Sequence, residues 1–153
     1  MRLTALVPTV ALAFAFAGAC SAATHIGLGV MAGEPTGLTL KAWSDGRHAI
    51  DAAAGWSLGD EGWLYLHADY LWHSYDFEPN DLPGSLPWYI GVGGRALLKG
   101  GEDSALGVRI PIGLDYLFRR QPFDIFVEVA PIIDLVPDTD FDLSGGVGVR
   151  FYF

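Results

Sequence analysis

Apolar and polar residues alternate along most of the chain after position 24. Between Val108 and Leu114, for example, the even-numbered residues are apolar, whereas the odd-numbered ones are Arg109, Pro111 and Gly113. A period of two is typical of a β-strand with one apolar face, and no long stretch has the periodicity of a helix. Eight such runs, separated by turn-forming residues, cover positions 25–32, 38–43, 48–58, 63–75, 88–98, 105–118, 123–135 and 141–153.

The length of these runs and the position of the aromatic residues favour a transmembrane barrel. Runs of about ten residues match a tilted strand that crosses a bilayer, and they exceed the roughly five or six residues usual in soluble sheets. Several apolar faces end in aromatic residues, as in the two interfacial girdles of a membrane barrel. These aromatic residues are Trp56, Tyr70, Trp72, Trp88, Tyr116, Phe118, Phe151 and Phe153. The pattern predicts an all-β fold, an eight-stranded antiparallel up-and-down transmembrane β-barrel; a soluble barrel with an aromatic core is the alternative.

The beginning of the chain predicts export. Arg2 precedes an apolar run over 5–17, and small residues follow it. This layout indicates a cleaved signal peptide over residues 1–23, because the apolar run is too short to span a bilayer. Residues 24–153 then form one β-barrel domain. Lipid attachment at Cys20, the only cysteine, is the alternative; we favour a small residue within the signal, because Ala17 replaces the usual leucine.

The charge of the chain argues against one class of partner. The sequence contains 18 Asp and Glu residues against 9 Lys and Arg residues, which gives a formal net charge of −9 at pH 7. An acidic chain binds nucleic acid poorly, because phosphate groups repel it. We therefore expect no nucleic-acid partner.

Four stretches carry a resemblance to a known group of proteins. They are GEPTGL at 33–38, LHADYLWH at 66–73, GVGGR at 91–95 and PDTDFDLSGGVGVRFYF at 137–153. With these stretches the chain resembles the small eight-stranded outer-membrane β-barrels, and above all a family of short, uncharacterised bacterial barrels. The resemblance implies a monomer in the outer membrane of a Gram-negative bacterium, in contact with outer-membrane lipids, with a structural or surface-interaction role. A soluble periplasmic or lipid-anchored binding barrel is the alternative.

The end of the chain is also similar to the assembly signal that outer-membrane barrels present to their insertion machinery. The similarity rests on Gly148 in the middle of the last strand and on the aromatic residues Phe151 and Phe153. Gly146 stands where a polar residue is usual. The resemblance implies that the barrel insertion machinery is a partner and that the last strand closes against the first.

The polar faces of the runs predict a charged interior. An eight-stranded barrel is just wide enough to be filled by side chains. Buried charges without partners cost several kcal/mol each, so we expect ion pairs that plug the bore; an ion-selective pore is the alternative. The predicted lumen residues are Lys41, Asp51, His67, Asp69, Arg95, Arg109, Asp115, Glu128 and Arg150.

One group of residues suggests an enzyme. His67, Asp69 and His73 share a strand face, and Ser57 lies on the neighbouring run, so a lipid A-modifying enzyme is a further alternative. These residues are expected to point into the bore rather than toward lipid, and no G-x-S-x-G motif is present. The PDTDFD stretch fails as a calcium loop, because Leu143 occupies the position that requires glycine. We expect no catalytic residue, no cofactor and no metal site.

Two features fit a regular barrel less well. Pro111 and Pro131 fall inside predicted strands, where each removes a ladder hydrogen bond, so we expect a bulge or a break at each. The longest connection, 76–87, lies on the periplasmic side if both termini face the periplasm. Such barrels usually have short turns there, so we expect an unusual topology or a segment that packs over the barrel end.

Overall fold

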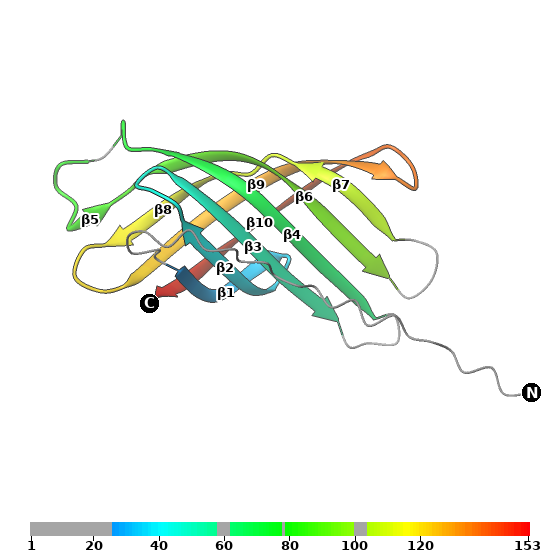
Figure 1. Cartoon of the computed structure of the whole chain (residues 1–153), viewed down its shortest axis with the longest axis horizontal. Helices are drawn as coiled ribbons and strands as arrows, with labels where there is room; N and C mark the ends of the chain where they lie inside the picture. The colour runs from blue at the N-terminus through cyan, green and yellow to red at the C-terminus, as the bar shows by residue number, and fades with distance from the viewer. Residues whose placement is uncertain (1–25, 58–61, 78, 100–103) are drawn as a thin grey trace, which may run out of the picture.

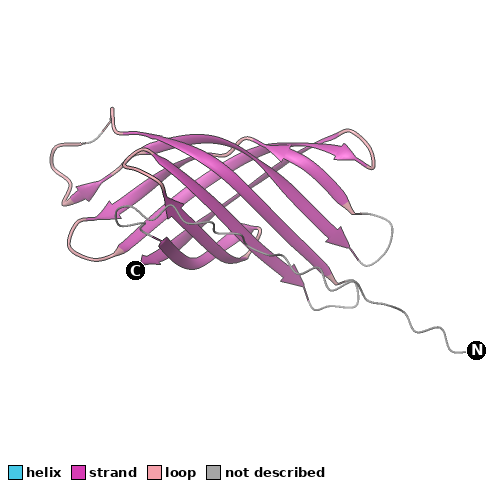
Figure 2. Ribbon diagram, viewed as in Figure 1, coloured by secondary structure: helices cyan, strands magenta, loops and turns pink. Residues whose placement is uncertain are grey.

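The computed structural model describes residues 26–57, 62–77, 79–99 and 104–153. The expected signal peptide and Cys20 lie outside these ranges. Every regular element within them is a strand, as Figure 2 shows. No helix in the described ranges is long and apolar enough to cross a membrane.

The strands correspond closely to the eight predicted runs. They are β1 (Ile26–Glu34), β2 (Gly37–Trp43), β3 (His48–Ser57), β4 (Trp63–Ser74), β5 (Gly84–Ser85), β6 (Trp88–Lys99), β7 (Ala105–Arg109), β8 (Ile112–Phe118), β9 (Phe123–Val136) and β10 (Asp140–Tyr152). β7 and β8 are the two halves of one predicted run, and β5 was not predicted. The all-β, antiparallel, up-and-down arrangement is confirmed.

The strand pairing closes the sheet on itself. β1, β2, β3, β4 and β6 pair in that order; β6 pairs with β7 and β8, and both of these pair with β9. β10 pairs with β9 on one side and with β1 on the other, where Gly27 is opposite Tyr152 and Gly33 is opposite Gly146 (Figure 1). With β7 and β8 counted as one strand, eight strands form the ring in the described part of the chain. The last strand closes against the first, as expected.

The ring has two ends, a terminal end and a distal end. The terminal end carries the start of β1, the end of β10 and the turns 44–47 and 119–122, and the distal end carries the turns 35–36 and 137–139.

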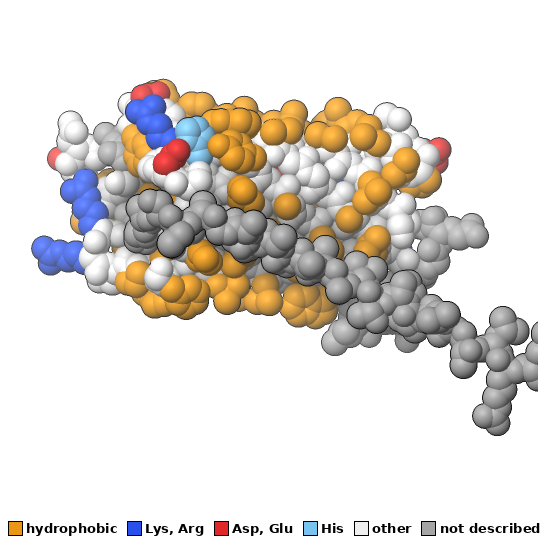
Figure 3. Space-filling model, viewed as in Figure 1, with side chains coloured by type: hydrophobic (Ala, Val, Ile, Leu, Met, Phe, Trp, Pro, Cys, Tyr) orange, Lys and Arg blue, Asp and Glu red, His pale blue; other side chains and the backbone are white. Residues whose placement is uncertain are grey.

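The two faces of the sheet have opposite polarity. On β9, Ile125 and Val127 point outward and are 49% and 48% exposed, whereas Asp124 and Glu128 point inward and are 0% and 6% exposed. The same alternation runs around the ring, so apolar side chains lie along the outer face (Figure 3). The fully buried side chains with the largest volumes include Arg109 and Arg150. The interior is therefore polar and the wall is apolar.

Only one of the two internal prolines interrupts its strand. Pro111 separates β7 from β8, as expected, whereas β9 continues through Pro131, so the expectation of a break there was wrong. The carbonyl oxygens of both prolines still accept hydrogen bonds. The backbone N–H of Ile110 donates to Pro131 O at 3.0 Å, and that of Gly91 donates to Pro111 O at 2.9 Å. Because Pro131 faces the gap beside Pro111, its missing N–H falls where the neighbouring strand is already interrupted.

The long connection between β4 and β6 returns to the wall. Its β5 pairs with β8, with Gly84 opposite Phe118 and Ser85 opposite Leu117. Further along, the backbone N–H of Asp115 donates to Pro87 O at 3.0 Å. β5 therefore extends the path of β6 beside β8 at the terminal end, where Figure 1 labels it.

Candidate functional site: the charged interior and the apolar wall

Charged side chains fill the interior of the closed sheet. All nine predicted lumen residues point inward, and each is at most 6% exposed. Two further buried carboxylates, Asp124 and Asp134, share the inward face of β9 with Glu128. Their position between apolar residues of the same strand is the signal that could have added them to the predicted set.

Arg150 and Asp115 lie at the centre of a cluster near the terminal end. Arg150 donates to Asp115 Oδ1 at 3.0 Å and to Asp124 Oδ1 at 3.0 Å. Lys41 donates to Asp115 Oδ2, and Nε2 of His73 lies 3.0 Å from the same oxygen. Two cations therefore hold two carboxylates that are fully buried, an arrangement that offsets the large desolvation penalty of each charge.

A second cluster lies in the middle of the bore around Arg109. Arg109 donates to Glu128 Oε1, and its Nε lies 3.0 Å from Asp69 Oδ2. The hydroxyl of Tyr89 donates to Glu128 Oε2 at 2.7 Å. His67 Nδ1 lies 3.1 Å from Asp69 Oδ2.

A third cluster lies near the distal end. Arg95 Nε donates to Asp134 Oδ1 at 3.0 Å, and its Nη1 donates to Asp142 Oδ2 at 2.9 Å. Each of the three arginines of the interior therefore holds at least two carboxylates.

Glycines on the inward face make room for large side chains. A Cβ atom on Gly113 would lie 2.5 Å from the ring of Tyr89, and one on Gly148 would lie 2.5 Å from the ring of Phe126. Gly148, a residue of the expected assembly signal, thus also provides the space into which an interior ring packs.

The fold brings together only two of the residues that suggested an enzyme, His67 and Asp69. His73 lies in the terminal cluster with Lys41 and Asp115, whereas His67 lies beside Asp69 in the middle cluster. Ala53 is directly opposite His67, and Ser57 is paired with Trp63 four residues further along β3. The strand register therefore separates the serine from both histidines.

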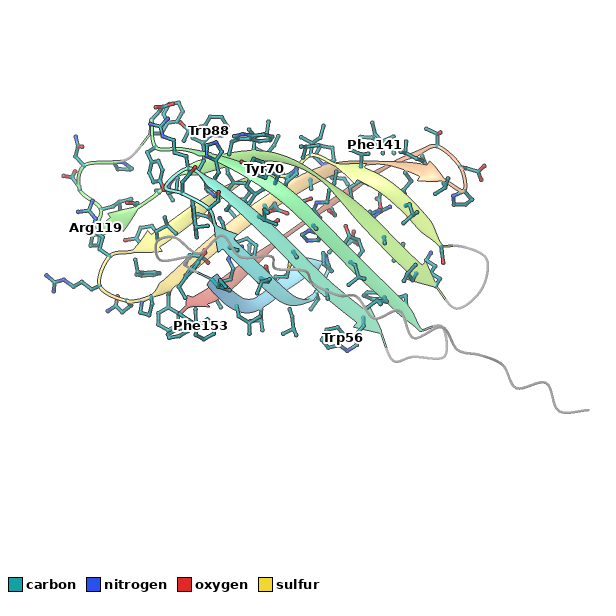
Figure 4. All side chains as sticks on the ribbon, viewed as in Figure 1. Trp56, Tyr70, Trp88, Arg119, Phe141 and Phe153 are labelled. Carbon is teal, nitrogen blue, oxygen red and sulfur yellow. The ribbon has the colours of Figure 1, made fainter. Side chains whose placement is uncertain are left out.

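Aromatic side chains on the outer face concentrate at the terminal end. Tyr70, Trp72, Phe118, Phe123, Phe151 and Phe153 are exposed there. At the distal end, Trp56 and Phe141 point away from the sheet (Figure 4). At the terminal end, neighbouring rings contact each other: the ring centroids of Phe151 and Phe153 lie 5.4 Å apart, and those of Phe123 and Phe151 lie 5.2 Å apart. The wall thus has an aromatic band at one end and isolated rings at the other.

Each end of the barrel carries a pocket. A pocket of about 870 Å³ at the terminal end is lined by Trp43, Tyr152 and the two turns. A pocket of about 590 Å³ at the distal end is lined by Trp63, Tyr65 and Arg95, among others. The two pockets share no residue, and the three charged clusters occupy the space between them.

The turn 44–47 carries a hydrogen-bonded carboxylate outside the interior. Asp45 accepts the backbone N–H groups of Arg47 at 2.7 Å and His48 at 2.8 Å, and Nδ1 of His48 lies 2.7 Å from its other oxygen. The hydrogen bond from Arg47, together with those from His48, lowers the pKa of Asp45 to about 2.

A closed antiparallel sheet with an apolar wall and a charged interior defines a small β-barrel. Among solved structures, the chain is similar to the N-terminal beta-barrel domain of Pseudomonas aeruginosa OprF. The match covers 84% of this chain and 95% of that domain, with a TM-score of 0.59 and 16% sequence identity. No protein-family model and no curated protein matches the sequence. The barrel fold is confirmed, and the closer resemblance to short bacterial barrels stays a prediction.

Proposed function

We propose that this chain is an integral protein of the bacterial outer membrane, with a structural or surface-interaction role and without enzymatic activity. The observation that carries the proposal is the inverted polarity of the sheet. A soluble protein rarely exposes contiguous apolar patches larger than a few hundred Å². Here apolar side chains cover the wall around the whole ring, so lipid is the surrounding that fits them.

The dimensions of the strands support the same placement. β4, β6, β9 and β10 contain 12 to 14 residues each, and about 9–11 suffice for a tilted strand to cross a bilayer. The aromatic band at the terminal end fits one membrane–water interface. Because the ring closes, the described strands leave no long open edge for pairing with another chain, which favours a monomer.

The bore is proposed to be closed. The ion pairs separate the two end pockets, and Trp43 Nε1 donates to the Tyr152 hydroxyl at 3.3 Å just inside the terminal end. We expect refolding into phospholipid vesicles to give a compact form that migrates faster on an unheated gel and does not conduct ions across a planar bilayer. Steady single-channel conductance would support the alternative, an ion-selective pore.

The rival proposal is a lipid A-modifying enzyme that uses His67 or His73. The register that separates Ser57 from both histidines disfavours it. Mass spectrometry of lipid A from cells with and without the protein distinguishes the two proposals. We expect identical lipid A masses; a mass change that His67→Ala abolishes would establish the enzyme.

Export through the signal peptide and insertion by the outer-membrane assembly machinery complete the proposal. Phe153 is 73% exposed at the terminal end, and its backbone N–H donates to Ile26 O at 3.0 Å. The last residue thus belongs to the seam between β1 and β10 while its ring stays accessible.

A further inference from the structure

Three potential metal ligands meet on two neighbouring strands in the middle of the bore. Asp51 on β3 is directly opposite Asp69 on β4, and His67 precedes Asp69 by two residues on the same inward face. One ligand atom from each residue lies within 4.8 Å of the other two. The three residues are 3%, 2% and 6% exposed, respectively.

The polar atoms of these residues have few partners. Asp51 Oδ1, both carboxylate oxygens of Asp69 and both ring nitrogens of His67 lack a partner in good hydrogen-bond geometry within the described part of the chain. Their close contacts are with each other: His67 Nδ1 lies 3.1 Å from Asp69 Oδ2, and the Asp51 and Asp69 carboxyl groups are within hydrogen-bonding reach. Buried polar atoms of this kind are normally satisfied. Arg109 reaches Asp69 only through Oδ2, so Oδ1 of Asp69 is left for another ligand.

The excess of negative charge in the interior also favours a bound cation. Six carboxylates are buried in the described part of the chain, namely Asp51, Asp69, Asp115, Asp124, Glu128 and Asp134. Among the same described residues, four Lys and Arg side chains are buried with them, namely Lys41, Arg95, Arg109 and Arg150. The excess of two negative charges equals the charge of one divalent cation. Arg150 Nη1 is 4.0 Å from Asp51, and its other nitrogens are engaged by Asp115 and Asp124.

We propose that Asp51, His67 and Asp69 bind one divalent transition-metal cation, for which Zn²⁺ is the best match. A histidine nitrogen with two carboxylate oxygens is a ligand set of Zn²⁺ and, with open positions, of Fe²⁺ or Mn²⁺; Mg²⁺ and Ca²⁺ prefer oxygen alone. Bonds of about 2.1 Å place two ligands about 3–4 Å apart, so the side chains need to move by roughly 1 Å or less. The sequence did not predict this site: His67 and Asp69 share a strand face, but the meeting with Asp51 depends on the register of β3 and β4.

The bound cation links β3 to β4 and neutralises the carboxylates that Arg109 and Arg150 leave partly unpaired. Its role is structural, because the three ligands are buried in the middle of the bore, each at most 6% exposed. The competing explanation is protonation, in which Asp51 and Asp69 share a proton and bind no metal.

The experiment uses the untagged protein, refolded in detergent micelles with Zn²⁺ present, freed of excess metal by dialysis and analysed by mass spectrometry for bound zinc. We expect about one Zn²⁺ per chain and a higher unfolding temperature than for protein refolded with a chelator. His67→Ala and the nearly isosteric Asp51→Asn should each lower the affinity at least about tenfold. Asp51→Asn keeps the test decisive if His67→Ala does not fold.

His48→Ala is the matched control, because His48 lies beside Asp45 at the terminal turn, outside the bore. The control should retain wild-type zinc binding. The proposal is overturned if wild type binds no zinc, if Asp51→Asn binds it as tightly as wild type, or if only His48→Ala loses it. The first of these results would favour the shared proton.

Discussion

Arg150 and Asp124 lie directly opposite each other on β10 and β9, and the Arg150 Nε donates to both carboxylate oxygens at 3.0 and 3.1 Å. The same guanidinium donates to Asp115 on β8 and stacks on the ring of Phe126 at 4.0 Å. One side chain therefore connects three strands through buried contacts. Its removal tests the energetic importance of the charged interior.

Replacement of Arg150 by alanine should leave Asp115 and Asp124 without their shared cation. Breaking a buried ion pair from one side costs about 3–5 kcal/mol, so the free energy of unfolding in detergent should fall by about that amount. Urea titration followed by gel mobility measures it. Arg119→Ala, which removes an exposed arginine of the turn 119–122 (Figure 4), should change the value by less than about 0.5 kcal/mol. Equal stability of both variants would contradict a supporting role for the ion pairs.

Deletion of Phe153 should impair assembly in cells more than it impairs stability. The ring is 73% exposed, so its loss costs at most about 2 kcal/mol of burial. If the insertion machinery recognises Phe153, the deletion variant should accumulate unassembled in the periplasm, while the purified variant still refolds in detergent. Immunoblots of cell fractions and the gel-shift assay provide the two readouts.

Phe123→Ala is the control for this deletion. Its ring lies 5.2 Å from that of Phe151 at the same end of the barrel but on β9, outside the terminal signal. It should reach the outer membrane at the wild-type level. If the Phe153 deletion also reaches that level, the terminal strand is not an assembly signal.

Replacement of Gly148 by alanine should destabilise the folded barrel without any assembly factor present. The new Cβ would lie 2.5 Å from ring carbons of Phe126, and overpacking of this kind costs about 1–3 kcal/mol. Gly46→Ala is the matched control, since no atom lies within 4 Å of the corresponding position. Unfolding in detergent compares the two. An unchanged stability of Gly148→Ala would mean that the glycine serves recognition alone.

The turn 44–47 should show a pH dependence that originates from Asp45. Its pKa is lowered from the ordinary value of 3.8 to about 2, so the ionised carboxylate stabilises the turn above about pH 4. This stabilisation is lost as the pH falls toward 2. The difference in unfolding free energy between wild type and Asp45→Asn should therefore shrink between pH 4 and pH 2. An NMR titration midpoint of Asp45 near 3.8 would refute the hydrogen-bonded turn.

The alternation of residues predicted the wall and the interior well, because side chains in a strand must alternate between the two faces. It placed Glu128 in the bore and Val127 on the wall. The same parity also applies to Asp124 and Asp134, which the predicted network left out. The effect of Pro131 depends on the neighbouring interruption at Pro111, which the pattern of its own strand does not contain.

The sequence alone does not determine most partners of the interior charges. Arg150 donates to Asp115 across the intervening β9, and Arg109 donates to Glu128. Such contacts depend on the width of the ring and the stagger of its strands, which no single run of residues determines. The meeting of Asp51 with His67 and Asp69 depends in the same way on the register of β3 and β4.

Fractionation of a Gram-negative host that produces this chain shows whether lipid covers the apolar wall. Membranes are washed with sodium carbonate at high pH, and the protein is then compared on heated and unheated gels. We predict that it stays in the outer-membrane fraction after the wash and migrates faster without heating. Release into the carbonate supernatant, or recovery with the soluble periplasmic proteins, would contradict the account.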